Sequence, residues 1–561
     1  MSKFIGAMDK YTPATTVGEN GHKQYGWVEP KAKEIKEGEI EETITQISFQ
    51  LVRQLGRKDE GVIEKYRTLL RRLKTENKLD YVLLLVKMCA HTRDIVSGKG
   101  EYQLAYSMLG ILFDFYPVVA GVLLERFVRL NIGGESVHPY GSWKDIKHFW
   151  QGRQHLNSII VNLVNGQLKI DEQNMREGKL VSLAGKWVPR EKTRYGWMFE
   201  ILACDYFDDI FFTAKEETKQ KAINMCKMKY RKLLSELNRH LDTTQVKQCG
   251  RNWKAIDPEK VTSVTLFKNK KAFLNKDKKG NERTGFFDRI ECAYNFTTFL
   301  ERAKKGQVEV KGKRIGLADF TKEALELIKT KNRQEIDMLN LQWVSNSSQN
   351  GALGNFVPLV DVSGSMEGDP LHAAISLGIR IAEKSKLGKR VLTFTSNPTW
   401  VNLENKNRFV DMVETLAKAE WGATTNFSRA LDLILEIVVQ QRMTAQEVKE
   451  ISLVILSDMM MNQADAGYNS VYDMVEKRYA DAGMKVHGEP YTPPHIIFWN
   501  LRSTSGFPNL SKQKNTSMLS GFSPMLLNLF CEKGVECLDS LTPWSVLLES
   551  LNNPRYDIEM V

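Results

Sequence analysis

Cysteine is scarce in this sequence, and its spacing excludes the common structural zinc sites. The 561 residues include seven cysteines, an odd number, and none forms a CxxC pair. The closest two, Cys531 and Cys537, are too far apart for a usual zinc-ligand pair and lack a second pair. Scattered cysteines of this kind favour reduced thiols in a cytosol-like compartment.

Long apolar runs are also missing. No uninterrupted run approaches the ~20 residues that a helix needs to cross a bilayer. The N-terminal stretch MSKFIGAMDKYTPATTVGENG lacks the apolar centre of a signal peptide. We therefore expect a cytoplasmic protein that has no membrane among its partners.

Catalytic motifs are missing as well. The nine histidines form neither HExxH nor a helical metal pair. No GxSxG elbow and no plausible cysteine nucleophile occurs. The stretch SGKGE (residues 97–101) does not fit GxxxxGK[ST], so it favours a turn between helices over a nucleotide loop. These absences predict a binding protein and not an enzyme.

The composition is that of a soluble globular protein with more than one domain. Apolar residues make up 42% and charged residues 26%, and 561 residues exceed what one core usually supports. Residues 351–561 hold 19 Lys and Arg against 24 Asp and Glu, whereas residues 1–350 hold 60 against 44. A basic half joined to an acidic half predicts two modules with different partners. The basic half fits nucleic-acid contact, although a solvated lysine surface gives the same balance.

The basic half has the pattern of consecutive helices. Ile44, Ile47 and Leu51 recur at helical spacing. Further helical patterns cover residues 83–95, 103–117, 118–131, 195–212, 216–241 and 316–343. Helices of this length with short joints predict an all-α array, for which irregular HEAT-like stacking is the preferred picture.

The acidic half, after the flexible stretch SNSSQNGALGN, alternates strand and helix patterns. Strands are predicted at 356–361, 390–396, 451–458 and 495–501, with helices at 370–386, 407–418, 427–442 and 471–482. The alternation predicts an α/β domain with a parallel, doubly wound sheet covered on both faces. Asp369 and Pro370 fit the N-cap and first residue of the first helix. The loop before them therefore lies at the carboxyl edge of the sheet, where open α/β folds bind ligands.

Five oxygen-bearing side chains are predicted to meet at this edge. Asp361, Ser363 and Ser365 follow the first strand at alternate positions, so their side chains point the same way. Thr425 precedes a helix and Asp458 ends a strand. A polar turn alone would explain the first three. Two carboxylates and three hydroxyls together form an all-oxygen ligand set that suits Mg²⁺ or Mn²⁺.

This constellation resembles the metal-ion-dependent adhesion site of von Willebrand factor A (VWA) domains. The resemblance implies a VWA, Rossmann-like fold and a metal ion held by all five residues, some of them through water. It also implies a protein partner whose acidic residue completes the coordination. Thr425 is matched because it precedes Asn426 in a GxTN-like turn, and Asp458 is placed by strand order.

Further stretches resemble a largely uncharacterised family of plants, other eukaryotes, large viruses and phages that joins a helical region to a VWA-like domain. They are TRDIVSGKGEYQLAY, YGSWKDI, LAGKWVPREKTRYG, YRKLLSELNRHLD and FWNLRSTSGFP. The match spans roughly residues 40–550. The family is similar in layout to the Ro (TROVE) RNA-binding proteins, which implies RNA as a partner by analogy. If the source is a virus, the expected location is the host cytoplasm or the virion.

The densest basic region is 268–314, with 14 Lys and Arg against six Asp and Glu and with phenylalanines between the charges. Cations with stackable rings are typical of single-stranded RNA binding. Core phenylalanines and a solvated lysine loop fit the pattern equally well. The candidate RNA-binding residues here are Lys268, Lys270, Lys271, Lys276, Lys278, Lys279, Arg283 and Phe286.

Three further basic candidates lie in the stretch GKWVPREK. Lys186, Arg190 and Lys192 would line a groove that contacts RNA. The alternative is that Trp187 belongs to the core and that Pro189 starts a helix.

These patterns lead to one main hypothesis and one alternative. The main hypothesis is a multidomain, non-enzymatic adaptor of ribonucleoprotein type, with a helical HEAT/TROVE-like domain that binds RNA and a VWA-like domain that binds a partner through the metal. The alternative is an interaction or structural scaffold that binds no RNA. The predicted parts are an N-terminal extension 1–39, a helical domain 40–345, a linker 346–355, a VWA-like domain 356–540 and a tail 541–561.

Overall fold

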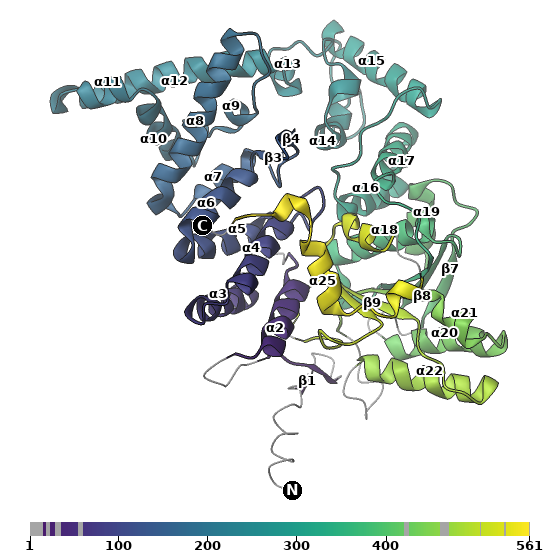
Figure 1. Ribbon diagram of the computed structural model, residues 1–561. Coiled ribbons are helices and arrows are strands. Elements are labelled where there is room, and N and C mark those ends of the chain that lie inside the picture. The colour runs from purple at the N-terminus through teal and green to yellow at the C-terminus, as the bar shows by residue number, and fades with distance from the viewer. Residues whose placement is uncertain are drawn as a thin grey trace. The chain divides into compact units, whose positions relative to one another are not determined.

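The computed structural model describes two compact units (Figure 1). The described residues are 15–17, 23–28, 35–53, 60–395, 397–419, 426–460, 471–504, 506–531 and 535–559. The first unit, here the sheet unit, combines residues 1–111 with 310–560. The second, here the helical unit, comprises residues 112–309.

The sheet unit is built on six strands in the order β10-β9-β8-β5-β6-β7. The strands are β5 (Asn355–Asp361), β6 (Arg390–Phe394), β7 (Thr399–Asn402), β8 (Ile451–Ser457), β9 (His495–Asn500) and β10 (Thr516–Ser520). All neighbours pair in parallel except β6 and β7. The predicted all-parallel sheet is thus mixed, because β7 follows β6 after a short connection that reverses the chain.

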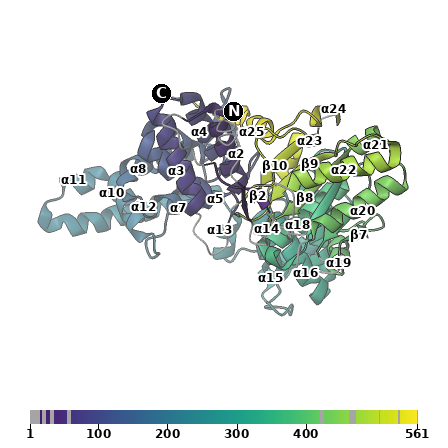
Figure 2. The same ribbon diagram turned by 90° about the horizontal axis from the view of Figure 1, so that it is seen from below.

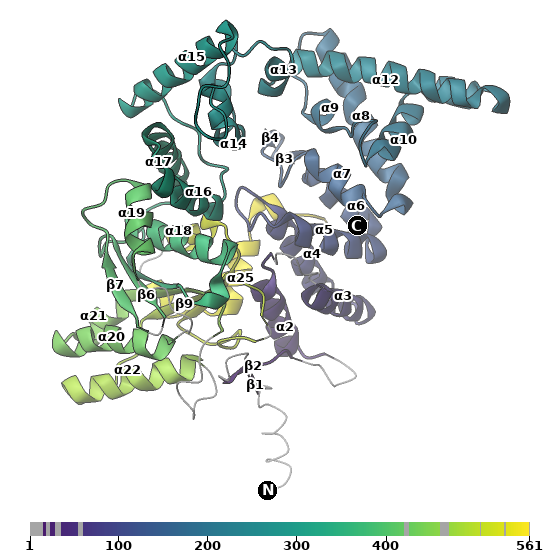
Figure 3. The same ribbon diagram turned by 180° about the vertical axis from the view of Figure 1, so that it is seen from behind.

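Helices cover both faces of this sheet, as Figure 3 shows. On one face Leu359 of β5 and Ile455 of β8 share a core with α20 (Phe427–Gln440) and α22 (Val471–His487). Val360 points to the other face, against α18 (Asp369–Lys384). The alternation follows from the two-residue period of a strand and explains why the central residues of these strands are mostly apolar on both faces.

The helix α18 lies close to the sheet because it carries a glycine at the contact. A Cβ added to Gly378 would lie 2.5 Å from Cγ2 of Val360. The start of α18 differs from the prediction by one residue. Asp369 is the first helical residue, and the N-cap is Gly368, whose φ of 97° is accessible to glycine at little cost.

The sheet unit also contains helices from both ends of the predicted helical half. They are α2 (Glu37–Gln50), α3 (Glu60–Thr75), α4 (Leu79–Arg93), most of α5 (Tyr102–Phe115), α16 (Leu317–Thr330) and α17 (Arg333–Ser347). Trp343 of α17 stacks on Phe409 of α19 (Phe409–Ala417), with ring centroids 3.9 Å apart. Arg380 of α18, which is fully buried, donates to the side chain of Asn346 at 2.9 Å. One compact unit therefore joins segments from both sides of the predicted linker.

The helices α20 and α22 lie side by side, as Figure 2 shows.

The remaining elements of the sheet unit are short or lie at its periphery. The other elements are β1 (Thr15–Val17), β2 (Lys23–Tyr25), η4 (Gly364–Met366), α21 (Ala445–Lys449), η5 (Pro524–Leu527), α23 (Asn528–Cys531), α24 (Val535–Leu538), α25 (Pro543–Leu551) and η6 (Pro554–Tyr556).

The helical unit consists mainly of helices, as the sequence predicts. Its helices are α6 (Pro117–Arg126), α7 (Lys144–Trp150), η1 (Gln154–Leu156), α8 (Asn157–Arg176), α9 (Ala184–Trp187), α10 (Gly196–Tyr206), α11 (Asp208–Thr213), η2 (Glu216–Thr218), α12 (Lys219–Leu241), α13 (Thr244–Cys249), η3 (Pro258–Lys260), α14 (Ser263–Phe273) and α15 (Phe287–Lys304). A small hairpin of β3 (Leu130–Ile132) and β4 (Glu135–Val137) interrupts them. Among the described residues, no helix has both the length and the apolar character needed to cross a membrane.

Candidate metal site and basic hollow

The two aspartates predicted as metal ligands lie on neighbouring strands at the carboxyl edge of the sheet. Asp361 is the last residue of β5, and Asp458 follows β8 directly. The register that pairs Val360 with Leu456 sets Asp361 beside Ser457. Both carboxylates are fully buried. The strand order thus brings together two side chains that are far apart in the sequence.

The environment of Asp361 opposes its ionisation. Burial raises the pKa of its carboxyl to about 7, and the negative charge of Asp458 acts in the same direction. Two hydrogen bonds oppose this shift: the Ser363 N–H donates to Oδ1 at 3.0 Å, and the Ser457 hydroxyl donates to Oδ2 at 2.6 Å. A nearby cation would therefore lower the free-energy cost of ionising the Asp361 carboxyl.

The predicted hydroxyl ligands lie in the loop after β5. Ser363 and Ser365 have their Oγ atoms 3.1 Å apart, so both hydroxyls reach the same point. Thr425 lies outside the described residues. Its neighbour Asn426 donates its backbone N–H to the carbonyl oxygen of Thr395, just after β6, at 3.2 Å. The start of α20 is therefore anchored beside the end of a strand that neighbours β5.

The structure adds two residues that the sequence pattern did not reveal. Ser457 binds Asp361, as described above. Arg502, two residues after β9, donates from Nη1 to the carbonyl oxygen of Ser365 at 2.8 Å. The same nitrogen lies 3.8 Å from Oδ2 of Asp458. Arg502 lies in the stretch FWNLRSTSGFP, which carries a family resemblance but gives no sign of a role at the metal site, so only the fold brings it there.

The residues present fit a hard divalent cation. The donors at the edge are carboxylate and hydroxyl oxygens, which Mg²⁺ and Mn²⁺ prefer. A bound cation would reduce the repulsion between the carboxylates of Asp361 and Asp458. Within the described ranges, no three His, Cys, Asp or Glu side chains gather as a metal-ligand group. A metal site here therefore depends on serine hydroxyls as well as on the two carboxylates.

A second candidate site is a hollow in the helical unit, here the basic hollow, with a volume of about 1390 Å³. Six basic side chains line it: Lys144, Lys186, Arg190, Lys192, Arg231 and Arg239. One acidic side chain, Glu191, also lines it and pairs with Arg231 and, at 3.6 Å, with Lys227. The three candidates from GKWVPREK thus lie in one hollow and are joined there by cations from α7 and α12.

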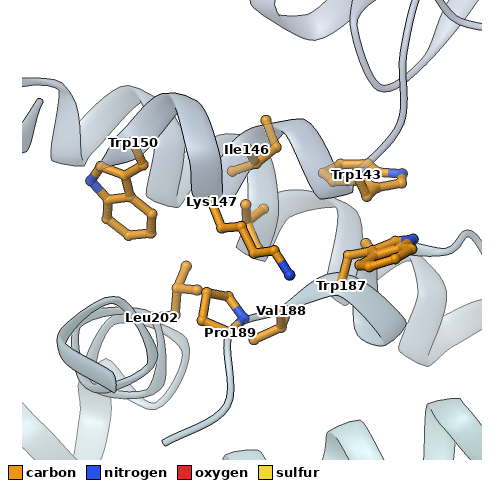
Figure 4. Close-up of a pocket in the computed structure, with 10 residues that line it drawn as sticks. Trp143, Ile146, Lys147, Trp150, Trp187, Val188, Pro189 and Leu202 are labelled. Carbon is orange, nitrogen blue, oxygen red and sulfur yellow. The ribbon is translucent and has the colours of Figure 1, made fainter. Parts of the chain in front are cut away.

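The indole of Trp187, which lines this hollow, lies close to three lysines. The ammonium groups of Lys144, Lys147 and Lys186 lie 6.0, 5.1 and 5.7 Å from the centroid of its indole. Figure 4 shows the Lys147 side chain reaching from α7 toward Trp187, beside a cavity of about 10 Å³. Trp187 is half-buried and is the last residue of α9. Pro189 lies after this helix and does not start another one.

Like charges crowd around Lys147. Burial lowers the pKa of its ammonium group, and the positive charges of Lys144, Arg190 and Arg194 lower it further. Burial also lowers the pKa of Lys186, whose Nζ donates to Oε1 of Gln245 at 3.0 Å. Several positive charges thus lie close together beside Trp187.

The candidates from the densest basic region lie on α14, in the loop after it and at the start of α15. Lys268, Lys271, Lys278, Lys279, Arg283 and Phe286 are exposed, and Lys276 is half-buried. Lys270 is buried, with its ammonium group 4.7 Å from the centroid of Phe267. Phe273 is buried and stacks on Phe296, whereas Phe286 is 75% exposed. Both sequence interpretations thus apply in part: some phenylalanines form core, and others face solvent.

The SGKGE stretch forms a turn between α4 and α5. Lys99 is buried and donates from Nζ to the carbonyl oxygen of Ser48 at 2.6 Å and to the hydroxyl of Ser520 at 2.5 Å. Its ammonium group is therefore engaged inside the sheet unit and does not face a ligand.

Comparisons with known proteins divide the chain near the predicted linker 346–355, and not at the boundary between the two compact units. Residues 151–348 match the family described as "Domain of unknown function (DUF2828)", and residues 355–542 match "Domain of unknown function (DUF7788)". "Uncharacterized protein L728" of Acanthamoeba polyphaga mimivirus is 28% identical over 495 residues, which cover 83% of this chain and 79% of the viral protein. The chain is therefore similar to a group of uncharacterised proteins that includes a viral member.

Proposed function

We propose that this protein is a non-enzymatic RNA-binding adaptor of ribonucleoprotein type. The helical unit binds RNA, and the sheet unit binds a protein partner through Mg²⁺ or Mn²⁺. The observation that carries the RNA part is the basic hollow, which is lined by six cations, one paired carboxylate and a half-buried indole. Phosphates are attracted by such a charge concentration, and bases stack on such rings.

We propose further that the sheet unit contains a VWA-like domain with an adhesion-type metal site. Asp361, Ser363, Ser365 and Asp458 would hold the ion, with Thr425 as the fifth predicted ligand. When bound, the ion would supply a positive charge for a carboxylate of the partner. The strand order, with the two aspartates at neighbouring strand ends, supports this proposal. A HEAT- or TROVE-like character of the helical part belongs to the same proposal and rests on its mainly helical packing and on the analogy of layout.

The RNA proposal is tested on the full chain, because helices from both ends of the basic half belong to the sheet unit. Purified protein is examined for retained nucleic acid by its absorbance ratio before and after nuclease digestion. Binding of structured and single-stranded RNA is then measured as a function of salt. Affinity that falls by about 0.7 log units per log unit of salt for each phosphate contacted supports the proposal. Absence of binding at low salt contradicts it and leaves the interaction scaffold as the better account.

A further inference from the structure

The Trp187 cluster, defined as Trp187 with Lys144, Lys147 and Lys186, differs from an ordinary basic surface. Three ammonium groups lie within 6.0 Å of the centroid of one indole. A cation over a ring face is weakly attracted to it, by much less than to a phosphate oxygen. A phosphate can therefore replace the contacts of these lysines with the ring, although Lys186 also donates to Oε1 of Gln245.

The surroundings of the cluster offer little negative charge that could compete with a ligand. Among the residues that line the basic hollow, Glu191 is the acidic one, and its carboxylate is engaged by Arg231 and Lys227. The hollow is also lined by four apolar side chains, namely Leu183 just before α9, Leu234 of α12, Val246 of α13 and Val264 of α14. The lining thus combines cations with apolar surface, as a nucleotide requires.

We infer that the Trp187 cluster is a nucleotide subsite for single-stranded RNA, in which a phosphate lies among Lys144, Lys147 and Arg190 and an adjacent unpaired base stacks on the indole of Trp187. This inference rests on the proposed RNA-binding function. The phosphate draws the ammonium groups away from the ring, and the ring face becomes available to the base. A base within a duplex cannot reach the indole, because both of its faces are already stacked. The subsite therefore selects single strands over duplexes.

The cations alone would also suit an acidic peptide. The indole and the apolar lining favour RNA, because a peptide carboxylate brings no flat ring that could replace the lysines on Trp187. Polyglutamate therefore serves as a competitor in the test. Competition that displaces RNA as effectively as unlabelled RNA does would overturn the inference in favour of an acidic protein segment.

The test uses the full chain and a fluorescently labelled oligouridylate of about 12 nucleotides, within the site sizes common for single-strand binders. An RNA duplex of equal length serves as the second probe. The variants are Trp187→Ala, Trp187→Phe and the double variant Lys144→Gln with Lys147→Gln. The comparison variant is Lys268→Gln with Lys271→Gln, which removes two exposed lysines of the other candidate RNA-binding region of the helical unit.

Trp187→Ala is expected to weaken oligouridylate binding at least about fivefold without changing its salt dependence, because stacking releases no counterions. Trp187→Phe retains a ring and is expected to keep most of the affinity, which separates stacking from misfolding. The double lysine variant is expected to flatten the salt slope by about 0.7 for one lost phosphate contact. Duplex binding is expected to be weaker than single-strand binding and to be insensitive to Trp187→Ala.

Other outcomes have distinct meanings. If Trp187→Ala and the double lysine variant bind as the unchanged protein does while the comparison variant Lys268→Gln with Lys271→Gln weakens, RNA binding stands but this subsite is wrong. Equal or tighter binding of the duplex also overturns the subsite. If the unchanged protein binds neither probe at low salt, the proposed RNA-binding function fails together with this inference.

Discussion

The guanidinium of Arg502 faces the carboxylate of Asp458, with Nη1 3.8 Å from Oδ2. The same nitrogen is fixed by the carbonyl oxygen of Ser365. The chain therefore supplies its own positive charge to an edge that carries two buried carboxylates. This charge is attached to the loop after β9, which is itself bound to α2, since the Thr504 N–H donates to Oε1 of Gln50 at 2.7 Å.

Arg502→Gln is expected to destabilise the metal-free protein by about 1 kcal/mol, a modest value because the Arg502 side chain is 37% exposed. Saturating Mg²⁺ is expected to remove this difference, because the ion then balances the carboxylates. Thermal unfolding in EDTA and in MgCl₂ measures both effects. The control is Arg408→Gln, which breaks an exposed pair with Asp411 on α19 and is expected to respond equally in both conditions. If the loss of stability in Arg502→Gln is the same in MgCl₂ as in EDTA, the charge of Arg502 does not substitute for the ion.

The raised pKa of Asp361 predicts a specific pH dependence. The folded protein holds the Asp361 proton up to about pH 7, whereas the unfolded chain releases it near the ordinary value of 3.8. Because the folded state binds the proton more tightly, the contribution of Asp361 to stability is present at low pH and is lost as the pH rises toward 7. The loss amounts to at most about 4 kcal/mol.

Asp361→Asn is therefore expected to be more stable than the unchanged protein at pH 8 in EDTA, and the difference is expected to vanish near pH 4. Urea unfolding at several pH values measures this. The same variant, and Asp361→Ala, are expected to lose Mg²⁺ or Mn²⁺ binding in calorimetry while keeping the fold. Undiminished metal affinity in either variant would show that the assigned site is wrong.

The sequence predicted the parts of the fold that depend on local patterns. The apolar runs of β5, β8 and β9 are buried on both faces, so their composition alone marks them as central strands. Asp361 and Asp458 follow from where two of those runs end. The strands β7 and β10 were not predicted, because TWVN is short and largely exposed at the sheet edge and TSMLS is rich in hydroxyl side chains.

The parts that the sequence did not predict depend on contacts between distant segments. Arg502 reaches a carbonyl oxygen 137 residues earlier in the chain. The lysines of α7 join Trp187 only because α7 lies beside the end of α9. Lys270 was grouped with exposed lysines by its neighbours in sequence, but its position on α14 turns it inward. No periodic pattern of apolar residues along the sequence indicates these long-range contacts.

The inward position of Lys270 predicts that charge reversal there acts on stability. Lys270 is 9% exposed, and its ammonium group is 3.4 Å from the carbonyl oxygen of Phe267. Lys270→Glu is expected to lower the free energy of unfolding by about 2 kcal/mol, because it buries a carboxylate beside an aromatic face and a carbonyl. Lys268→Glu and Lys271→Glu are expected to stay within about 0.5 kcal/mol. Urea unfolding of the three variants checks this, and equal stabilities would contradict the buried placement. Loss of RNA binding in Lys270→Glu is therefore no measure of a phosphate contact.

Lys99 gives the last prediction, because it is a buried cation that binds the end of a helix. Its Nζ donates to the carbonyl oxygen of Ser48 and to the Ser520 hydroxyl, and burial lowers its pKa to about 7 although Glu101 acts in the opposite direction. The unfolded chain keeps its proton up to the ordinary value of 10.5, so the folded state binds fewer protons between about pH 7 and 10.5, and stability rises with pH across that range. Lys99→Met lacks this group, so the unchanged protein is expected to gain about 2–3 kcal/mol relative to the variant between pH 7 and 9. Urea unfolding at both pH values measures the gain. A difference independent of pH would mean that Lys99 keeps its charge in the folded protein, in which case its hydrogen bonds to α2 and β10 compensate the cost of burial.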